Sequence, residues 1–205
     1  MLMKNDRRLA AVVFVLTLSY PALVYFGLKR YSPKVVALAV GTVLVLRLLS
    51  GRHREGGRRL VLLLFPPLGL CAISAVANNR EFLLYLPVLF SMALLCSFGF
   101  TLHRPPSMVE NFARLSIPDL TTDEAAHCRR TTQVWAGFFL LNGSIAFYTA
   151  RWGSLEFWGL YNGFLTYLAM GVLFTAEFVY RHFRFRRYIG LPTDPLLRRL
   201  FPPKA

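Results

Sequence analysis

Acidic residues are scarce in this 205-residue chain: ten Asp and Glu stand against 24 Lys and Arg, which gives a formal net charge of +14. The few acids fall mostly in loops, and no DxxxD-type cluster is present to hold a Mg²⁺-bound diphosphate. P-loop, GxSxG and HExxH motifs are absent as well. The four histidines do not stand at metal-ligand spacing from one another or from a carboxylate. We therefore expect no metal, no cofactor and no catalytic residues. These absences argue against an enzyme but do not exclude one.

Cysteine is also rare, with only three residues. Cys71 and Cys96 lie inside apolar runs and Cys128 lies in a polar stretch. The odd number argues against a framework of paired disulfides, and the spacings do not suggest a zinc site. No cleavable signal peptide is convincing, because the first apolar run is too long and Tyr20-Pro21 replaces the small residues of a cleavage site. We read this run as a retained helix.

Hydrophobic residues are abundant: they make up 55% of the chain, and the mean hydropathy is +0.45. Spanning the hydrocarbon core of a bilayer takes about 20 apolar residues. Six stretches qualify or nearly qualify, although the second and third are weak enough that five spans stay an alternative. The predicted spans are 9–28, 35–50, 60–77, 82–102, 132–150 and 155–180. The predicted fold is thus an all-α, polytopic membrane bundle forming a single transmembrane domain over 1–205.

The cations test this arrangement, because cytoplasmic loops of membrane proteins are enriched in Lys and Arg. When alternate connections are assigned to opposite sides, 18 cations fall on one side and five on the other, and Arg47 lies within a span. This asymmetry predicts that both termini are cytoplasmic. The charge therefore mostly encodes orientation, so we expect contact with anionic membrane lipids rather than with nucleic acid.

The connection 103–131 is the only sizeable extramembrane segment, and a basic cytoplasmic tail follows at 181–205. After Pro105-Pro106, the apolar residues Met108, Val109, Phe112 and Leu115 recur at helical spacing, which predicts a short amphipathic helix on the membrane. Ile117-Pro118 should end it. Thr122, followed by two acids, predicts the start of a new helix that continues into the fifth span.

Polar residues within a bilayer are costly, so those in spans five and six are the candidate site residues. Asn142 and Asn162 are expected to form hydrogen bonds between helices, and a ligand pocket is the alternative. Trp135 shares a helical face with Asn142. Glu177 should form an ion pair with Arg181 one turn further on, the alternative being a carboxylate that binds a proton or a headgroup. Gly159-x-x-x-Gly163 predicts close helix packing within the chain, and a seam between copies in a homo-oligomer is the alternative.

Several stretches resemble a family of small bacterial inner-membrane proteins. Those proteins are encoded beside acyl-carrier-protein and ketosynthase genes in aryl-polyene (xanthomonadin-type) pigment clusters. The matching stretches are Tyr20 to Leu28, Arg104 to Leu115, Pro118 to Leu120, Arg129 to Gly143, Trp158-x-x-Tyr161-Asn162-Gly163, and Glu177. The resemblance implies a cell-inner-membrane location and a role in lipid or polyene biogenesis. It makes an acidic acyl carrier protein the expected partner, with Arg129 and Arg130 as docking residues.

A more distant resemblance connects the chain to the intracellular septation protein A family of inner-membrane proteins. The shared pattern is a Pro-led amphipathic loop, Trp135-Ala-x-Phe-Phe-x-x-x-Gly143, Trp158, and the closing Tyr180-Arg181-His182. This family implies a role in division and envelope integrity. Three hypotheses follow: a non-catalytic docking protein of the cell envelope, a lipid-handling enzyme or transporter component, and a septation scaffold that contacts other membrane proteins.

Overall fold

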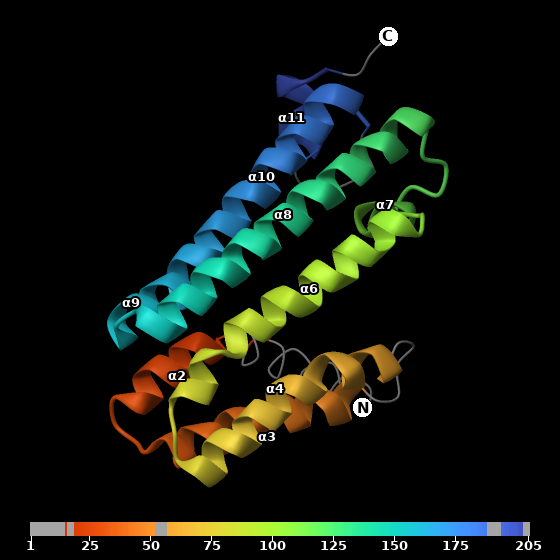
Figure 1. The fold of residues 1–205 in the computed structure, drawn as a ribbon. Coiled ribbons are helices and arrows are strands. Elements are labelled where there is room, and N and C mark those ends of the chain that lie inside the picture. The colour runs from red at the N-terminus through yellow and green to blue at the C-terminus, as the bar shows by residue number, and fades with distance from the viewer. Residues whose placement is uncertain (1–14, 16–18, 52–56, 188–193, 203–205) are drawn as a thin grey trace, which may run out of the picture. The chain divides into compact units, whose positions relative to one another are not determined.

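The fold was analysed in a computed structural model, which describes residues 15, 19–51, 57–187 and 194–202. Every regular element among these residues is a helix, so the predicted all-α class is confirmed (Figure 1). In chain order the elements are α2 (Tyr20–Leu28), α3 (Pro33–Gly51), α4 (Gly57–Ala77), α5 (Glu81–Leu84), α6 (Leu86–His103), α7 (Met108–Arg114), α8 (Thr122–Trp152), α9 (Leu155–Leu160), the π-helical turn η1 (Tyr161–Leu165), α10 (Thr166–Phe185) and α11 (Asp194–Leu200).

Helices lie where the apolar runs predict them. The second and third runs are α3 and α4, and the fifth lies inside α8. The fourth is divided at Tyr85 into α5 and α6, because Pro87 lies in the first turn of α6, where proline is tolerated and its missing N–H leaves no bond unmade. Part of the first run (9–14 and 16–18), Arg52, Arg54 and parts of the tail lie outside the described residues.

By their contacts the residues form two compact units, and the boundaries fall within the long helices. Unit 1 contains residues 1–94 and 139–166, and unit 2 contains 95–138 and 167–205. Each unit is described by itself.

Unit 1 packs α2 against α3, α9 and η1. Trp158 of α9 is fully buried, and its indole Nε1 donates to the Leu84 carbonyl oxygen at 2.9 Å. A Cβ at Gly159 would lie 2.5 Å from the Tyr25 ring, so the missing side chain is what lets α9 approach α2. The GxxxG pattern therefore serves packing within the chain at Gly159, as expected.

Unit 2 contains the connection 103–131. Its first helix is α7, which is the predicted amphipathic helix. The Glu110 carboxylate accepts a hydrogen bond from the Ser107 N–H at 3.3 Å and pairs with Arg114 at 2.7 Å. The apolar side chains of Phe112 and Leu115 are exposed, which is the arrangement expected of a helix that lies on a membrane.

The start of α8 at Thr122 is also as predicted. The residue that caps it is Thr121. Its hydroxyl accepts from the Glu124 N–H at 3.3 Å, and the Glu124 carboxylate accepts from the Thr121 N–H at 2.9 Å. This reciprocal pair satisfies two N–H groups that the helix itself leaves free.

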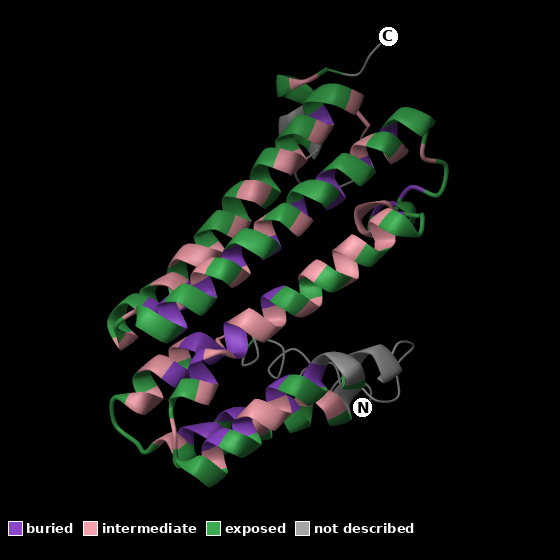
Figure 2. Cartoon of the chain, in the orientation of Figure 1, coloured by how far each residue is buried: buried purple, intermediate pink, exposed green. Residues whose placement is uncertain are grey.

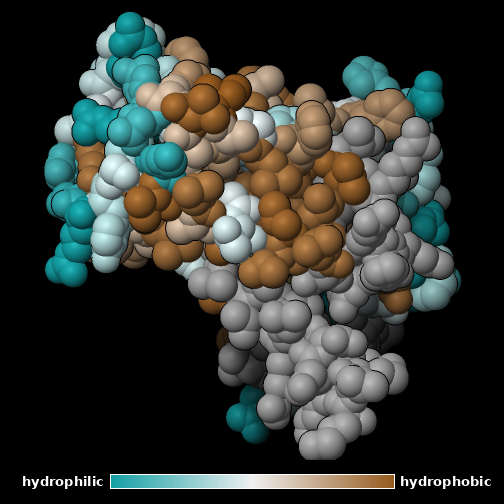
Figure 3. All heavy atoms as spheres, turned by 90° about the horizontal axis from the view of Figure 1, so that it is seen from below, coloured by the Kyte–Doolittle hydropathy of each residue, from teal (hydrophilic) through white to brown (hydrophobic). Residues whose placement is uncertain are grey.

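Two helical stretches among the described residues are long and apolar enough to cross a membrane: Glu81–His103 and Leu155–Phe185. No residue of the most apolar 18-residue stretch within Leu155–Phe185 is buried. Figure 2 shows the same feature as exposed and intermediate colours along most of α10. The space-filling view of Figure 3 shows that hydrophobic residues cover much of the surface formed by the described residues on this face.

We expect Gly159→Ala to destabilise the protein by about 1–3 kcal/mol, because the new methyl group forces the Tyr25 ring or α9 to move. Thermal unfolding of the purified protein in detergent measures this. Gly171→Ala is the matched control, since a Cβ there meets nothing within 4 Å and should leave stability unchanged or slightly higher. Equal effects of the two substitutions would contradict this account of the packing.

Candidate functional site

The first candidate site is a buried hydrogen-bond network around Asn142 in unit 1. The Asn142 amide nitrogen donates to the Ser91 hydroxyl at 2.9 Å. Its carbonyl oxygen accepts from the Tyr161 hydroxyl at 3.1 Å and from the Thr166 hydroxyl at 3.0 Å. One side chain thereby joins α6, α8, η1 and the first residue of α10. These are the hydrogen bonds between helices that were predicted for Asn142.

Close backbone approach supports this network. A Cβ at Gly143, next to Asn142, would lie 3.1 Å from the Ser91 Cβ. The glycine therefore allows α8 to come near α6, and Ser91 comes within hydrogen-bond distance of the Asn142 amide. Ser91, Tyr161 and Thr166 were not singled out from the sequence as network members. The sequence gives little indication of their role, because an isolated hydroxyl group in an apolar helix commonly bonds to a carbonyl group of its own helix.

Asn162 lies in the π-helical turn and is buried. Its amide nitrogen donates to the Trp158 carbonyl oxygen at 3.0 Å and to the Thr149 hydroxyl at 3.3 Å. Its own carbonyl oxygen is buried and has no hydrogen-bond partner among the described residues. Asn162 is therefore held in place by α8 and α9, with one acceptor left over.

Trp135 is buried in unit 2, where its ring meets those of Phe138 at 5.7 Å and Phe174 at 5.9 Å in edge-to-face geometry. These contacts give it a packing role within the unit. Trp135 and Asn142 lie seven residues apart on α8, and they belong to different units.

The second candidate site surrounds Glu177 in unit 2. The predicted ion pair between Glu177 and Arg181 is wrong. The Glu177 carboxylate instead lies 3.4 Å from Nε2 of His127, and both side chains are largely buried, while the Arg181 guanidinium lies 3.6 Å from Sγ of Cys128. The reason lies in the tertiary structure. His127 of α8 lies next to Glu177, and Cys128 of α8 lies next to Arg181. Because these partners are 50 or more residues apart in the chain, the spacing of residues within one helix could not predict the pairs.

A second set of charges ties the connection before α8 to the residues after α10. Arg187 pairs with Asp119 at 2.8 Å and with Glu124 at 3.0 Å. The hydrogen bond from Arg187 lowers the pKa of Asp119 below its ordinary value, and the same bond raises the pKa of the Arg187 guanidinium. Both groups therefore stay charged at neutral pH.

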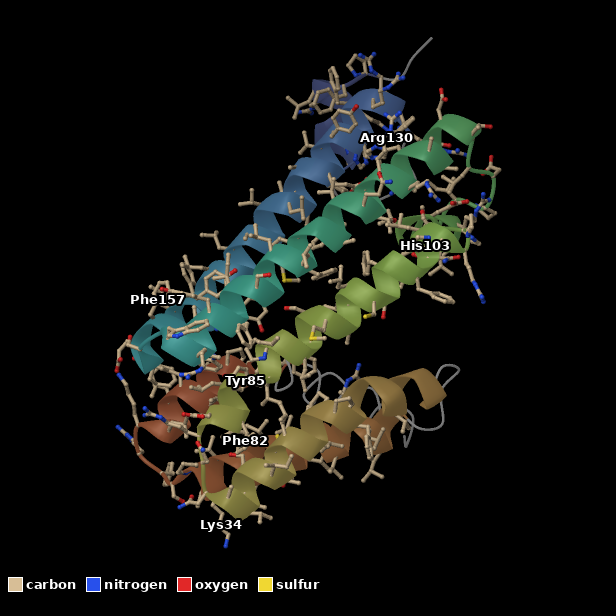
Figure 4. The ribbon with its side chains drawn as sticks, viewed as in Figure 1. Lys34, Phe82, Tyr85, His103, Arg130 and Phe157 are labelled. Carbon is tan, nitrogen blue, oxygen red and sulfur yellow. The ribbon has the colours of Figure 1, made fainter. Side chains whose placement is uncertain are left out.

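Arg129 and Arg130 lie on α8 and are exposed. Figure 4 labels Arg130. Neither has an ion-pair partner among the residues that the structure describes. Arg130 also lines a cavity of about 120 Å³ with His127, Tyr180 and Arg184. Within the described ranges, no group of three His, Cys, Asp or Glu side chains is placed to hold a metal ion.

No protein-family model, no curated protein and no solved structure matches this chain. The resemblance to the membrane proteins of aryl-polyene clusters, and the more distant one to the septation protein A family, stay predictions from the residues quoted above. The statements that follow about function rest on the geometry of the described residues together with the pattern of charge and hydropathy.

We expect Asn142→Leu to lower stability by roughly 1–2 kcal/mol, because Ser91, Tyr161 and Thr166 lose a shared partner. Thermal unfolding in detergent measures the change. Ser144→Ala is the control, since that exposed hydroxyl bonds only to the Leu140 carbonyl of its own helix. An Asn142→Leu variant of unchanged stability would contradict the packing interpretation and favour a ligand-binding role for Asn142.

Proposed function

We propose that this chain is a non-catalytic, multi-pass protein of the bacterial inner membrane that docks acidic partners on a basic cytoplasmic face. In this proposal about six helices span the bilayer and both termini are cytoplasmic. The role is to support lipid, polyene or envelope biogenesis by holding a soluble partner at the membrane.

The observation that carries the proposal is the unburied apolar surface of α10. Val172, Phe174 and Val179 are each more than two-fifths exposed, in a stretch where nothing is buried. A water-soluble monomer rarely exposes a continuous apolar surface of this kind, and such a surface indicates contact with a membrane or with another protein. The helix is also long enough to cross the hydrocarbon core.

The distribution of cations supports the orientation. Unit 2 carries the connection 103–131 and the described part of the tail, both of which the alternation of spans assigns to the cytoplasm. The acids of this unit are largely used internally: Glu110 pairs with Arg114, Asp119 and Glu124 pair with Arg187, and Glu177 lies beside His127. Arg129 and Arg130 are therefore left to attract external anions.

The expected partner is an acidic acyl carrier protein, which follows from the resemblance to aryl-polyene cluster proteins. Docking would be electrostatic, with Arg129 and Arg130 meeting carboxylates of the partner. Exposed Phe112 of α7, together with exposed Leu115 directly after this helix, would keep the docking surface close to the bilayer.

Two alternatives have less support. A lipid-handling enzyme or transporter component would need Asn142, Asn162 and Glu177 to face a ligand, but Asn142 already uses three hydrogen bonds for packing. A septation scaffold would act through contacts with other membrane proteins, and its support is the septation protein A resemblance alone.

The six-span orientation is tested by cysteine labelling in cells, in a background where Cys71, Cys96 and Cys128 are serine. Arg30→Cys lies on the predicted outer side and should react with a membrane-impermeant maleimide in intact cells. Arg184→Cys lies on the predicted cytoplasmic side and should react only after permeabilisation. Labelling of both positions in intact cells would contradict the orientation.

Docking is tested with purified protein in lipid nanodiscs and a holo acyl carrier protein as the probe. We expect the double charge reversal Arg129→Glu with Arg130→Glu to weaken binding about tenfold or more at low ionic strength, because attraction becomes repulsion. The difference should shrink as salt rises, since exposed charges are screened over about 10 Å at 0.1 M salt.

The matched control reverses two exposed cations on the predicted opposite side, Arg80→Glu with Arg151→Glu, with the same change in net charge. This variant should bind the carrier protein as the unmodified protein does. Unchanged binding by the Arg129 and Arg130 variant would overturn the docking proposal.

A further inference from the structure

A small cavity of about 120 Å³ lies between the first turns of α8 and the last turns of α10, within unit 2. Asp123, Ala126, His127 and Arg130 line it from α8, and Tyr180 and Arg184 line it from α10. A water molecule takes about 30 Å³ of liquid, so the space suits a group of a few heavy atoms rather than an acyl chain.

The charges around the cavity favour an anion. Arg130 and Arg184 are both exposed, and neither has an ion-pair partner among the described residues. Asp123 contributes one opposing charge, which leaves a positive balance at the lining. Two guanidinium groups offer paired N–H donors in a planar fork, the geometry that matches phosphate oxygens.

His127 gives the cavity a fixed wall. Its Nε2 lies 3.4 Å from both the Glu177 carboxylate and the Thr131 hydroxyl, and its ring stands 5.4 Å from that of Tyr180 and 5.5 Å from that of Phe185. Held from two helices, the imidazole keeps one orientation.

The surroundings favour a lipid as the source of the anion. Val179 and Phe183 are exposed beside the cavity-lining residues of α10, and the apolar stretch of Leu155–Phe185 precedes them. A phosphate in the cavity would therefore have apolar surface next to it for attached acyl chains. Tyr180 is exposed at this end of the helix, where aromatic residues mark the boundary between lipid and water.

We infer that this cavity binds the phosphate headgroup of an anionic phospholipid, with Arg130 and Arg184 as the principal ligands and His127 as a positioned wall. The inference rests on the proposed membrane insertion and orientation, but it is independent of the acyl-carrier-protein partner. It gives the charges at this end of α8 and α10 a lipid-binding role besides orientation.

Native mass spectrometry of the detergent-purified protein, titrated with phosphatidylglycerol or with phosphatidylcholine, tests the inference. The unmodified protein should retain phosphatidylglycerol in preference to phosphatidylcholine. Arg130→Gln with Arg184→Gln should weaken that binding about tenfold or more, because charge-assisted hydrogen bonds to the phosphate are lost. Arg104→Gln with Arg199→Gln removes the same charge from exposed positions outside the cavity lining and should leave the preference intact.

Ala126→Phe is a second variant that keeps every charge but fills the cavity, and it should also abolish the preference. Equal loss in both double variants, or full retention in Ala126→Phe, would overturn the site. An excess of inorganic phosphate that displaces the lipid and remains bound would overturn the lipid as occupant in favour of a free anion. A protein that is extracted from cells without detergent would instead overturn the proposed membrane insertion.

Discussion

The unburied apolar surface of Leu155–Phe185 is the constraint on which the other features depend. In water this surface would carry a large unfavourable hydration free energy. In the proposed bilayer that cost disappears, but there is then no water to satisfy polar groups, so a polar group without a partner inside the protein is costly. The hydrogen bonds of Asn142 and the indole bond of Trp158 to a main-chain carbonyl avoid this penalty.

Helix association in lipid cannot rely on the hydrophobic effect, since acyl chains are as apolar as leucine. Close contact between small residues and a few polar bonds must replace it. Gly159 against Tyr25, and Gly143 against Ser91, are two of the places where unit 1 achieves this contact. Asn162 lies in the π-helical turn Tyr161–Leu165 and donates to Thr149 of α8, so this local departure from α-helix also contributes to the packing.

Local patterns in the sequence predict the helices well, and tertiary pairs poorly. The apolar runs give α3, α4 and the core of α8, and Thr122 with its acids gives the start of α8. The break at Tyr85 was missed because Pro87 is compatible with either a kinked helix or a new one. The predicted Glu177–Arg181 pair failed for a different reason: an i, i+4 rule sees one helix, whereas the structure supplies His127 from another.

The way unit 2 distributes its charges explains why one basic surface can serve two binding partners. Glu124 is buried at the start of α8, and its carboxylate both caps the helix and pairs with Arg187, which also binds Asp119. These bonds hold the connection before α8 against the residues that follow α10, and they use acids that would otherwise neutralise nearby arginines. Arg129 and Arg130 therefore form no ion pair among the described residues, and they lie on a helix whose start is fixed. A rigid position lowers the entropic cost of binding. Adjacent residues on a helix diverge by about 100°, so Arg130 lines the cavity while Arg129 does not. In the proposed arrangement the lipid headgroup and the protein partner would thus share Arg130, whereas Arg129 would serve the protein partner alone.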